Sequence, residues 1–134
     1  APDRTIEHRF SMDVTDSAAA GERNPGFVRL ATLYNQLVSE GVPADRVRFA
    51  LVVHGRATFD LMTNAAYRAR LGSDNPNVQL LAELDRAGVQ VIVCGQALLN
   101  RKVDPATLLP FVKVASSAVT AHAALLAKGY SRLD

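Results

Sequence analysis

The only cysteine of the chain, Cys94, stands where a thiol could do chemistry. It ends the run VQVIVC, which is rich in β-branched side chains, and Gly95 and Gln96 follow it directly. A cysteine thiolate is a nucleophile that can attack a polarised sulfur atom and carry it as a persulfide. Unpaired cysteine is also among the most often buried residue types, so position alone favours a structural thiol equally.

Polar side chains follow three other apolar runs. His54 and Gly55 come after VRFALVV, Ser116 and Ser117 come after FVKVA, and two aspartates come after the first alternating run. The carboxyl ends of parallel strands meet at one edge of a sheet, where ligands and chemistry collect. A nearby imidazole would also favour the thiolate form of a cysteine.

These positions give a predicted site. We expect Cys94 and His54 to be catalytic. We expect the binding residues to be Gly55, Gly95, Gln96, Ser116, Ser117 and Asp16. Simpler roles are also open, because Ser117 is first of all a candidate helix N-cap, and Asp13 and Asp16 suit a solvated, capping loop.

Two further histidines suit packing better than chemistry. His8 lies on the apolar side of a predicted strand, and His122 shares a helical face with apolar residues, so we expect both to be packed in the core or at a subunit contact. We expect no metal and no cofactor. A single cysteine cannot supply a structural zinc framework, and no phosphate-binding or dinucleotide-binding glycine pattern occurs.

Hydrophobic periodicity indicates the elements that would carry these residues. Period-two or continuous apolar runs predict strands over 5–14, 47–53, 89–93, 111–115 and 130–133. Helical spacing or capping signals predict helices from 27 to 41, 58–72, 78–88, 104–109 and 116–129. The alternation predicts one α/β domain over 1–134, with a mainly parallel sheet of about five strands and helices on both faces.

Composition excludes several classes of partner. The 134 residues are 49% hydrophobic and 21% charged, and the formal net charge is only +2, with the basic residues scattered. We therefore expect a soluble globular protein that does not bind nucleic acid. No apolar run approaches the roughly 20 residues of a membrane span. The first residue is Ala1, so we expect a periplasmic location if this reflects export processing, and a cytoplasmic one otherwise.

Four motifs, in this order and at these intervals, resemble the DsrE/DsrF-like family: VVHG, NPN, AGVQVIVCGQAL and LAKGY. The resemblance covers roughly residues 5 to 133 and is greatest for the stand-alone, YchN-like members. It implies a flavodoxin-like fold, assembly into trimers or hexamers, and a cysteine that accepts sulfur as a persulfide and passes it on in a sulfur relay. Cys94 would be the acceptor and His54 the adjacent histidine, with donor and acceptor proteins as partners.

Two hypotheses of different classes remain. The first is a sulfurtransferase or persulfide carrier, which predicts a partly accessible, reactive thiol at Cys94. The second is a non-catalytic, homo-oligomeric module that binds a small ligand in the crevice at the strand ends. The nearly all-apolar helix AVTAHAALLA favours a homo-oligomer under both, since such a helix needs more cover than one sheet face provides.

Overall fold

The computed structural model describes residues 1–134 and contains one five-stranded sheet in which every pair of neighbouring strands is parallel. The strand order is β4-β3-β2-β1-β5. The strands are β1 (His8–Val14), β2 (Val47–Val53), β3 (Gln90–Cys94), β4 (Lys113–Ala115) and β5 (Ser131–Arg132). The predicted α/β class with a five-stranded parallel sheet is therefore confirmed, although β1 and β4 begin two or three residues later than their sequence patterns indicate.

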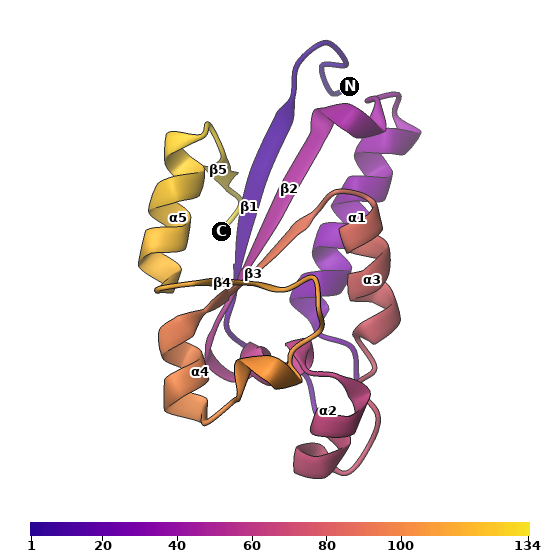
Figure 1. Cartoon of the computed structure of the whole chain (residues 1–134). Coiled ribbons are helices and arrows are strands. Elements are labelled where there is room, and N and C mark those ends of the chain that lie inside the picture. Colours follow the sequence, from indigo (N-terminus) through magenta and orange to yellow (C-terminus); the bar gives the residue numbers. More distant parts are fainter.

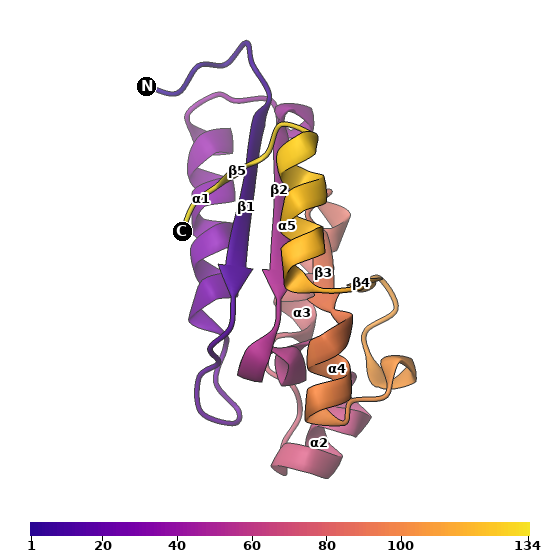
Figure 2. The same ribbon diagram turned by 90° about the vertical axis from the view of Figure 1, so that its left-hand side faces the viewer.

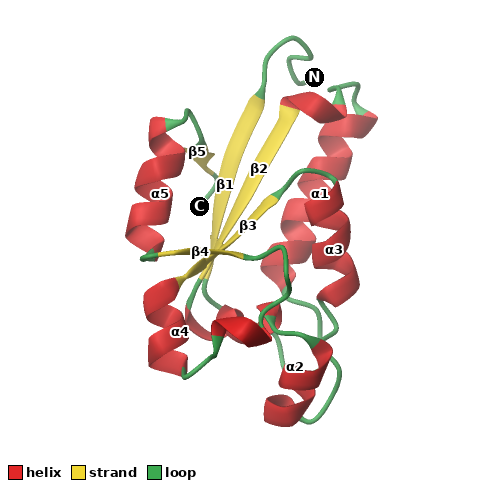
Figure 3. Ribbon diagram, in the orientation of Figure 1, coloured by secondary structure: helices red, strands yellow, loops and turns green.

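Helices cover both faces of the sheet and its carboxyl-terminal edge (Figures 1 and 3). The α-helices are α1 (Pro25–Ser39), α2 (Asn64–Leu71), α3 (Val78–Arg86), α4 (Gly95–Arg101) and α5 (Ala118–Ala127). Short 3-10 helices are η1 (Ala44–Arg46), η2 (Gly55–Leu61) and η3 (Pro105–Thr107). α1 and α3 lie on one face and α5 on the other, while α2 and α4 lie beyond the arrowheads of β1 and β2 (Figure 2).

Two predicted helices are wrong in their boundaries. The predicted helix 58–72 is divided, because Met62 leaves the helical path to form an isolated bridge with Leu108, and Thr63 then caps α2 by accepting a hydrogen bond from the Ala66 N–H. The predicted helix 104–109 is only the short η3, and the longer helix α4 starts at Gly95, directly after the cysteine. Tertiary contacts decide both outcomes, and they outweigh local periodicity.

The two faces of the sheet have cores of very different size. On the α1 and α3 side, 23 buried residues form one cluster, to which β2 contributes Val47, Phe49, Leu51 and Val53. The α5 side holds a cluster of only six: Ala50, Val52, Ile92, Ala121, Leu125 and Tyr130. α5 consequently leaves Val119 78% exposed and Leu126 69% exposed. None of the helices has the length and apolar character that crossing a bilayer requires.

Candidate functional site

Strand register aligns the residues that follow three neighbouring strands. Val53 of β2 pairs with Val93 of β3, so His54 and Cys94 hold equivalent positions one residue further along. Cys94 in turn pairs with Ala115 of β4, which places Ser116 just beyond the same edge. Because neighbouring strands are about 4.8 Å apart, the register brings these residues of distant sequence into one region.

The Cys94 thiol is more buried than we expected. Its side chain is at the N-cap position of α4, where the sulfur accepts a hydrogen bond from the Ala97 N–H at 3.4 Å. The residue is only 7% exposed. Access to the thiol is therefore restricted to the side on which Cys94 lines a surface crevice.

This crevice, which we call the Cys94 crevice, has a volume of about 440 Å³. Its walls come from the ends of β2 and β3, from α4 and from the start of α5. The lining residues are His54, Gly55, Cys94, Gln96, Ala97, Asn100, Arg101, Ser117, Ala118 and Val119. Five predicted site residues are thus brought together: His54, Gly55, Cys94, Gln96 and Ser117. Asn100 and Arg101 also line the crevice but were not among the predicted site residues, because the sequence pattern did not reveal the full length of α4.

Two glycines let the backbone segments around the Cys94 crevice approach closely. Gly55 has a φ of +60°, and a Cβ at this position would lie 2.8 Å from the Thr15 carbonyl oxygen. A Cβ at Gly95 would lie 2.8 Å from the Ala115 carbonyl oxygen. Gly95 does not line the crevice but allows the start of α4 to pack against the end of β4, so both glycines shape the site through the backbone.

Two other predicted binding residues, Asp16 and Ser116, make structural contacts outside the Cys94 crevice. Asp16 is exposed and its carboxylate pairs with Arg56 at 3.0 Å. The Ser116 hydroxyl lies 2.9 Å from the Thr120 hydroxyl. Ser117 lines the crevice and also caps α5 through a capping box with Thr120, as its position suggested.

A cluster of three titratable residues stands behind His54. The Nε2 atom of His54 lies 2.8 and 2.9 Å from the two carboxylate oxygens of Asp13, and the Nε2 atom of His122 lies 2.8 Å from one of them. We call these residues the His-Asp-His cluster. The Asp13 side chain is 18% exposed and that of His122 is 13% exposed. Burial alone would raise the pKa of Asp13, but the hydrogen bonds from His122 and His54 outweigh it and hold this pKa below its ordinary value.

The His-Asp-His cluster fixes which nitrogen of each imidazole carries hydrogen. An ionised carboxylate can only accept hydrogen bonds, so both Nε2 atoms must be donors. In neutral His54 the Nδ1 atom is then left with a free lone pair and can accept a proton. The Nδ1 atom of His122 is buried without a hydrogen-bond partner, which suits an unprotonated nitrogen better than a buried, unpaired N–H.

Sequence reasoning missed the His-Asp-His cluster. It assigned His122 to helix packing and Asp13 to a solvated loop, whereas Asp13 is a residue of β1 and His122 meets it across the α5 face of the sheet. Strand alternation gave a partial signal, because Asp13 must point to the opposite face from Met12 and Val14. His8 is different: it is buried as expected, with its Nε2 atom 2.6 Å from the Asp3 carbonyl oxygen.

A parallel α/β sheet with a thiol and an imidazole at adjacent strand ends defines the class of this protein, and the comparisons give its family. Residues 11–133 match the DsrE/DsrF-like family, and the chain belongs to that family. Its fold is similar to the solved structure of MTH1491 from Methanobacterium thermoautotrophicum, described as a protein of unknown function. The TM-score is 0.67 at 18% identity, covering 95% of this chain and 98% of the other.

Other comparisons add no activity. No curated protein sequence matches the chain. The likeness to MTH1491 is a likeness of fold and carries no residue roles. No group of three or more histidine, cysteine or acidic side chains has a geometry that could hold a metal ion. What the site can do chemically therefore depends on the residues of the Cys94 crevice.

Proposed function

We propose that this protein takes up sulfur on Cys94 as a persulfide and passes it on. Membership of the DsrE/DsrF-like family suggests a role related to sulfur relay. The observation that carries the proposal is that Cys94 and His54 line the same crevice, with His54 oriented by Asp13. A nucleophile and a base held by a third group form the usual arrangement for an activated thiol.

Sulfur uptake would be a displacement at the outer sulfur of a donor persulfide. The Cys94 thiolate forms a bond to that sulfur, the sulfur–sulfur bond of the donor breaks, and its electron pair leaves with the donor thiolate. Cys94 then carries the persulfide, and no external oxidant is needed. Attack by an acceptor thiolate on the outer sulfur of this persulfide would return Cys94 to the thiolate.

His54 would manage the proton in this cycle. Because its Nε2 donates to Asp13, its Nδ1 is available to accept a proton. The two side chains line the same crevice but share no hydrogen bond, so the proton would pass between the Cys94 thiol and His54 through one water molecule, and would return by the same route to the leaving thiolate. The carboxylate of Asp13 would stabilise the imidazolium that forms in between. His122 would support this carboxylate by the second hydrogen bond.

Intact-mass analysis after incubation with an organic persulfide tests the proposal. The wild-type protein should gain the mass of one sulfur atom, and Cys94→Ala should gain none while keeping its fold. His54→Gln should slow the gain by about 100-fold, at the lower end of the range expected for general acid–base catalysis. His8→Gln is a matched control, because His8 lies at the opposite, amino-terminal end of β1 and should leave the rate unchanged. A wild-type protein that acquires no sulfur from any donor would refute persulfide carriage.

We also propose that the protein is a homo-oligomer, a trimer or hexamer, that buries the outer face of α5. Val119 and Leu126 of α5 and Val114 of β4 are large apolar side chains, each more than half exposed. Light scattering should show an assembly of three or six chains, and Leu126→Asp should shift it towards the monomer. Lys128→Asp is the control: it places the same acidic residue at an exposed position just after α5, and it should leave the assembly intact. Monomer alone at micromolar concentrations of the wild-type protein would contradict the proposal.

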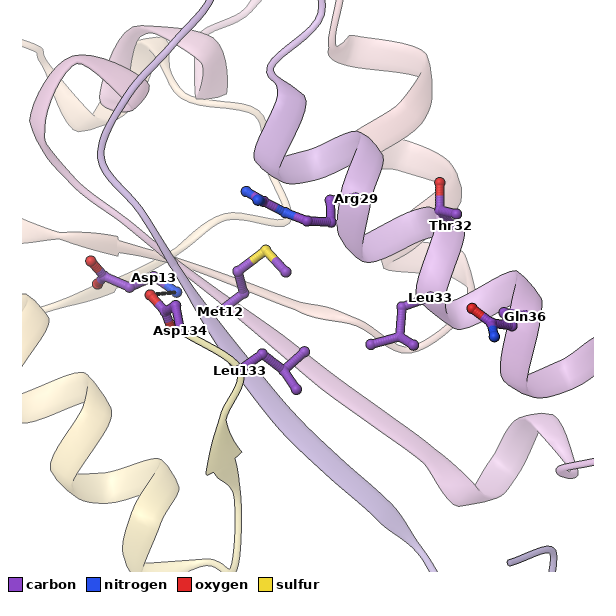
Figure 4. Close-up of a pocket in the computed structure, with 8 residues that line it drawn as sticks. All are labelled: Met12, Asp13, Arg29, Thr32, Leu33, Gln36, Leu133 and Asp134. Atoms are coloured by element: carbon purple, nitrogen blue, oxygen red, sulfur yellow. Dashed lines mark hydrogen bonds between the residues drawn. The ribbon is translucent and has the colours of Figure 1, made fainter. Parts of the chain in front are cut away.

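A second candidate function is small-ligand binding without catalysis, and a second cavity favours it. This cavity, of about 570 Å³, is lined by Met12, Asp13, Arg29, Thr32, Leu33, Gln36, Leu133 and Asp134 (Figure 4). It exceeds the Cys94 crevice in volume but contains no nucleophile, so we place the chemistry in the crevice. Ligand binding that survives Cys94→Ala but is lost in Leu33→Asp would favour this second function.

A further inference from the structure

We infer that the sulfur donor at Cys94 is a small anion whose negative group is held by Arg101; this inference rests on the proposed persulfide function. Arg101 is the only residue with a permanent charge that lines the Cys94 crevice, and no carboxylate lines it. The remaining polar lining residues, apart from His54 and Cys94, are Gln96, Asn100 and Ser117, whose amides and hydroxyl can donate hydrogen bonds. The crevice therefore favours a negatively charged guest.

The Arg101 guanidinium is free to take such a guest. It makes no ion pair and no side-chain hydrogen bond within the chain. Seven other arginines, among them Arg56 and Arg68, are engaged through their side chains with acidic side chains or carbonyls. Its backbone is fixed, since the Arg101 carbonyl accepts a hydrogen bond from Arg70 at 2.9 Å. An unpaired guanidinium on a fixed helix end is well suited to bind an oxyanion.

The burial of Cys94 restricts the size of the donor. With only 7% of the residue exposed, the thiol can be reached through the Cys94 crevice alone, and a volume of about 440 Å³ is in the range of small-molecule sites. A thiol on a folded partner would have to be carried into the crevice on a protruding segment, whereas a small donor can enter it directly. The geometry favours a donor that enters the crevice whole.

Thiosulfate is the simplest member of this class and is the probe we choose. The Cys94 thiolate attacks the outer sulfur of thiosulfate, a new sulfur–sulfur bond forms, and the bond to the sulfonate sulfur breaks. Its electron pair leaves with sulfite, and Cys94 keeps the persulfide. Charge is conserved at three negative charges on each side, and Arg101 stabilises the sulfite as negative charge develops on the leaving group.

A pair of alkylating agents measures the anion preference without sulfur transfer. Iodoacetate is anionic and iodoacetamide is neutral, and both alkylate Cys94 with loss of iodide. Arg101→Gln should lower the iodoacetate-to-iodoacetamide rate ratio by about three- to tenfold, as expected for one charge near a partly exposed site. Arg101→Lys, which keeps the charge, should restore most of the ratio. Arg86→Gln is the matched control, because exposed Arg86 at the end of α3 does not line the crevice.

Thiosulfate loading then tests the donor itself, by intact mass and by sulfite released. We expect Cys94 to gain one sulfur, with one sulfite per sulfur, and Arg101→Gln to slow loading by a similar factor while Arg86→Gln does not. Equal alkylation ratios in the two Gln variants, or loading indifferent to Arg101, would overturn the inference. If the organic persulfide loads Cys94 equally fast in the wild type and in Arg101→Gln, and thiosulfate does not load it, the anion inference fails and the carrier function stands. If neither donor loads Cys94, both fail.

Discussion

Replacing Asp13 by Asn removes the charge that joins two histidines. The carboxylate accepts hydrogen bonds from His54 and His122 in one partly buried place. An Asn oxygen can still accept one of the two, but its amide nitrogen is itself a donor and would face the other imidazole N–H. One charge-assisted hydrogen bond is lost and a mostly buried donor on His122 is left unpaired.

The expected cost follows from these two losses. Hydrogen bonds to charged groups contribute about 1.5–3 kcal/mol, so we expect Asp13→Asn to lower the free energy of unfolding by about 2–3 kcal/mol at neutral pH. The pKa of Asp13 is held below its ordinary value in the folded protein. Its contribution is therefore present above the unfolded-state pKa of about 4 and is lost as the pH falls through the lower folded-state pKa. The difference between wild type and variant should shrink in acid.

Urea denaturation at one fixed protomer concentration is the assay, since assembly would make the apparent stability depend on concentration. Asp16→Asn is the matched control. The Asp16 carboxylate is 81% exposed and pairs only with an exposed arginine, so its loss should cost less than about 0.5 kcal/mol. If the two variants lose the same free energy with unchanged denaturant slopes, the His-Asp-His cluster does not stabilise the fold and the reasoning is refuted.

Two further predictions concern single residues near the strand ends. Burial raises the pKa of Asp60 to about 6 despite a hydrogen bond from Asn24. As the pH rises from about 4 to about 7, the buried carboxyl group becomes charged, and the wild-type protein should lose about 2 kcal/mol of stability from this group. Asp60→Asn should flatten that part of the pH profile in urea titrations, and an unchanged profile would show that Asp60 is not its source. Gly55→Ala should destabilise the fold by about 1–3 kcal/mol more than Gly72→Ala. Both glycines have a positive φ, but only at Gly55 would an added Cβ meet another atom, the Thr15 carbonyl oxygen. Equal thermal shifts in the two variants would contradict this.

The sequence was sufficient for those features that depend on short-range pattern. The continuous apolar runs of β2 and β3 identify buried strands of a parallel sheet, and parallel strands by themselves bring His54 and Cys94 to one edge. Ser117 was predictable as a helix N-cap because its hydroxyl and the helix it precedes are adjacent in the chain. These features need no knowledge of how distant segments pack.

Features that depend on the return of the chain were not predictable. His122 meets Asp13, 109 residues away, because the chain after β4 places α5 over β2 and β3 on the opposite face of the sheet from α1, and from there the His122 side chain reaches Asp13 of β1. Arg101 belongs to the Cys94 crevice because α4 starts directly at Gly95, where a glycine suggested a turn rather than seven residues of helix. The burial of Cys94 itself depends on side chains from these same distant elements.

The unequal cores on the two sides of the sheet imply unequal resistance to local opening. Amide hydrogens of β2, and of the other strands and helices whose side chains pack in the 23-residue cluster, should exchange with solvent only on global unfolding. α5 is held by a cluster of six residues and by the short β5 that follows it, so its amides should exchange through smaller and more frequent openings. Because a neighbouring copy on α5 would close that route, the exchange rate of α5 should fall as protein concentration rises, while that of β2 should not change. Since α5 carries both His122 and the Ser117 wall of the Cys94 crevice, the same openings would release the site from its supports before the rest of the fold gives way.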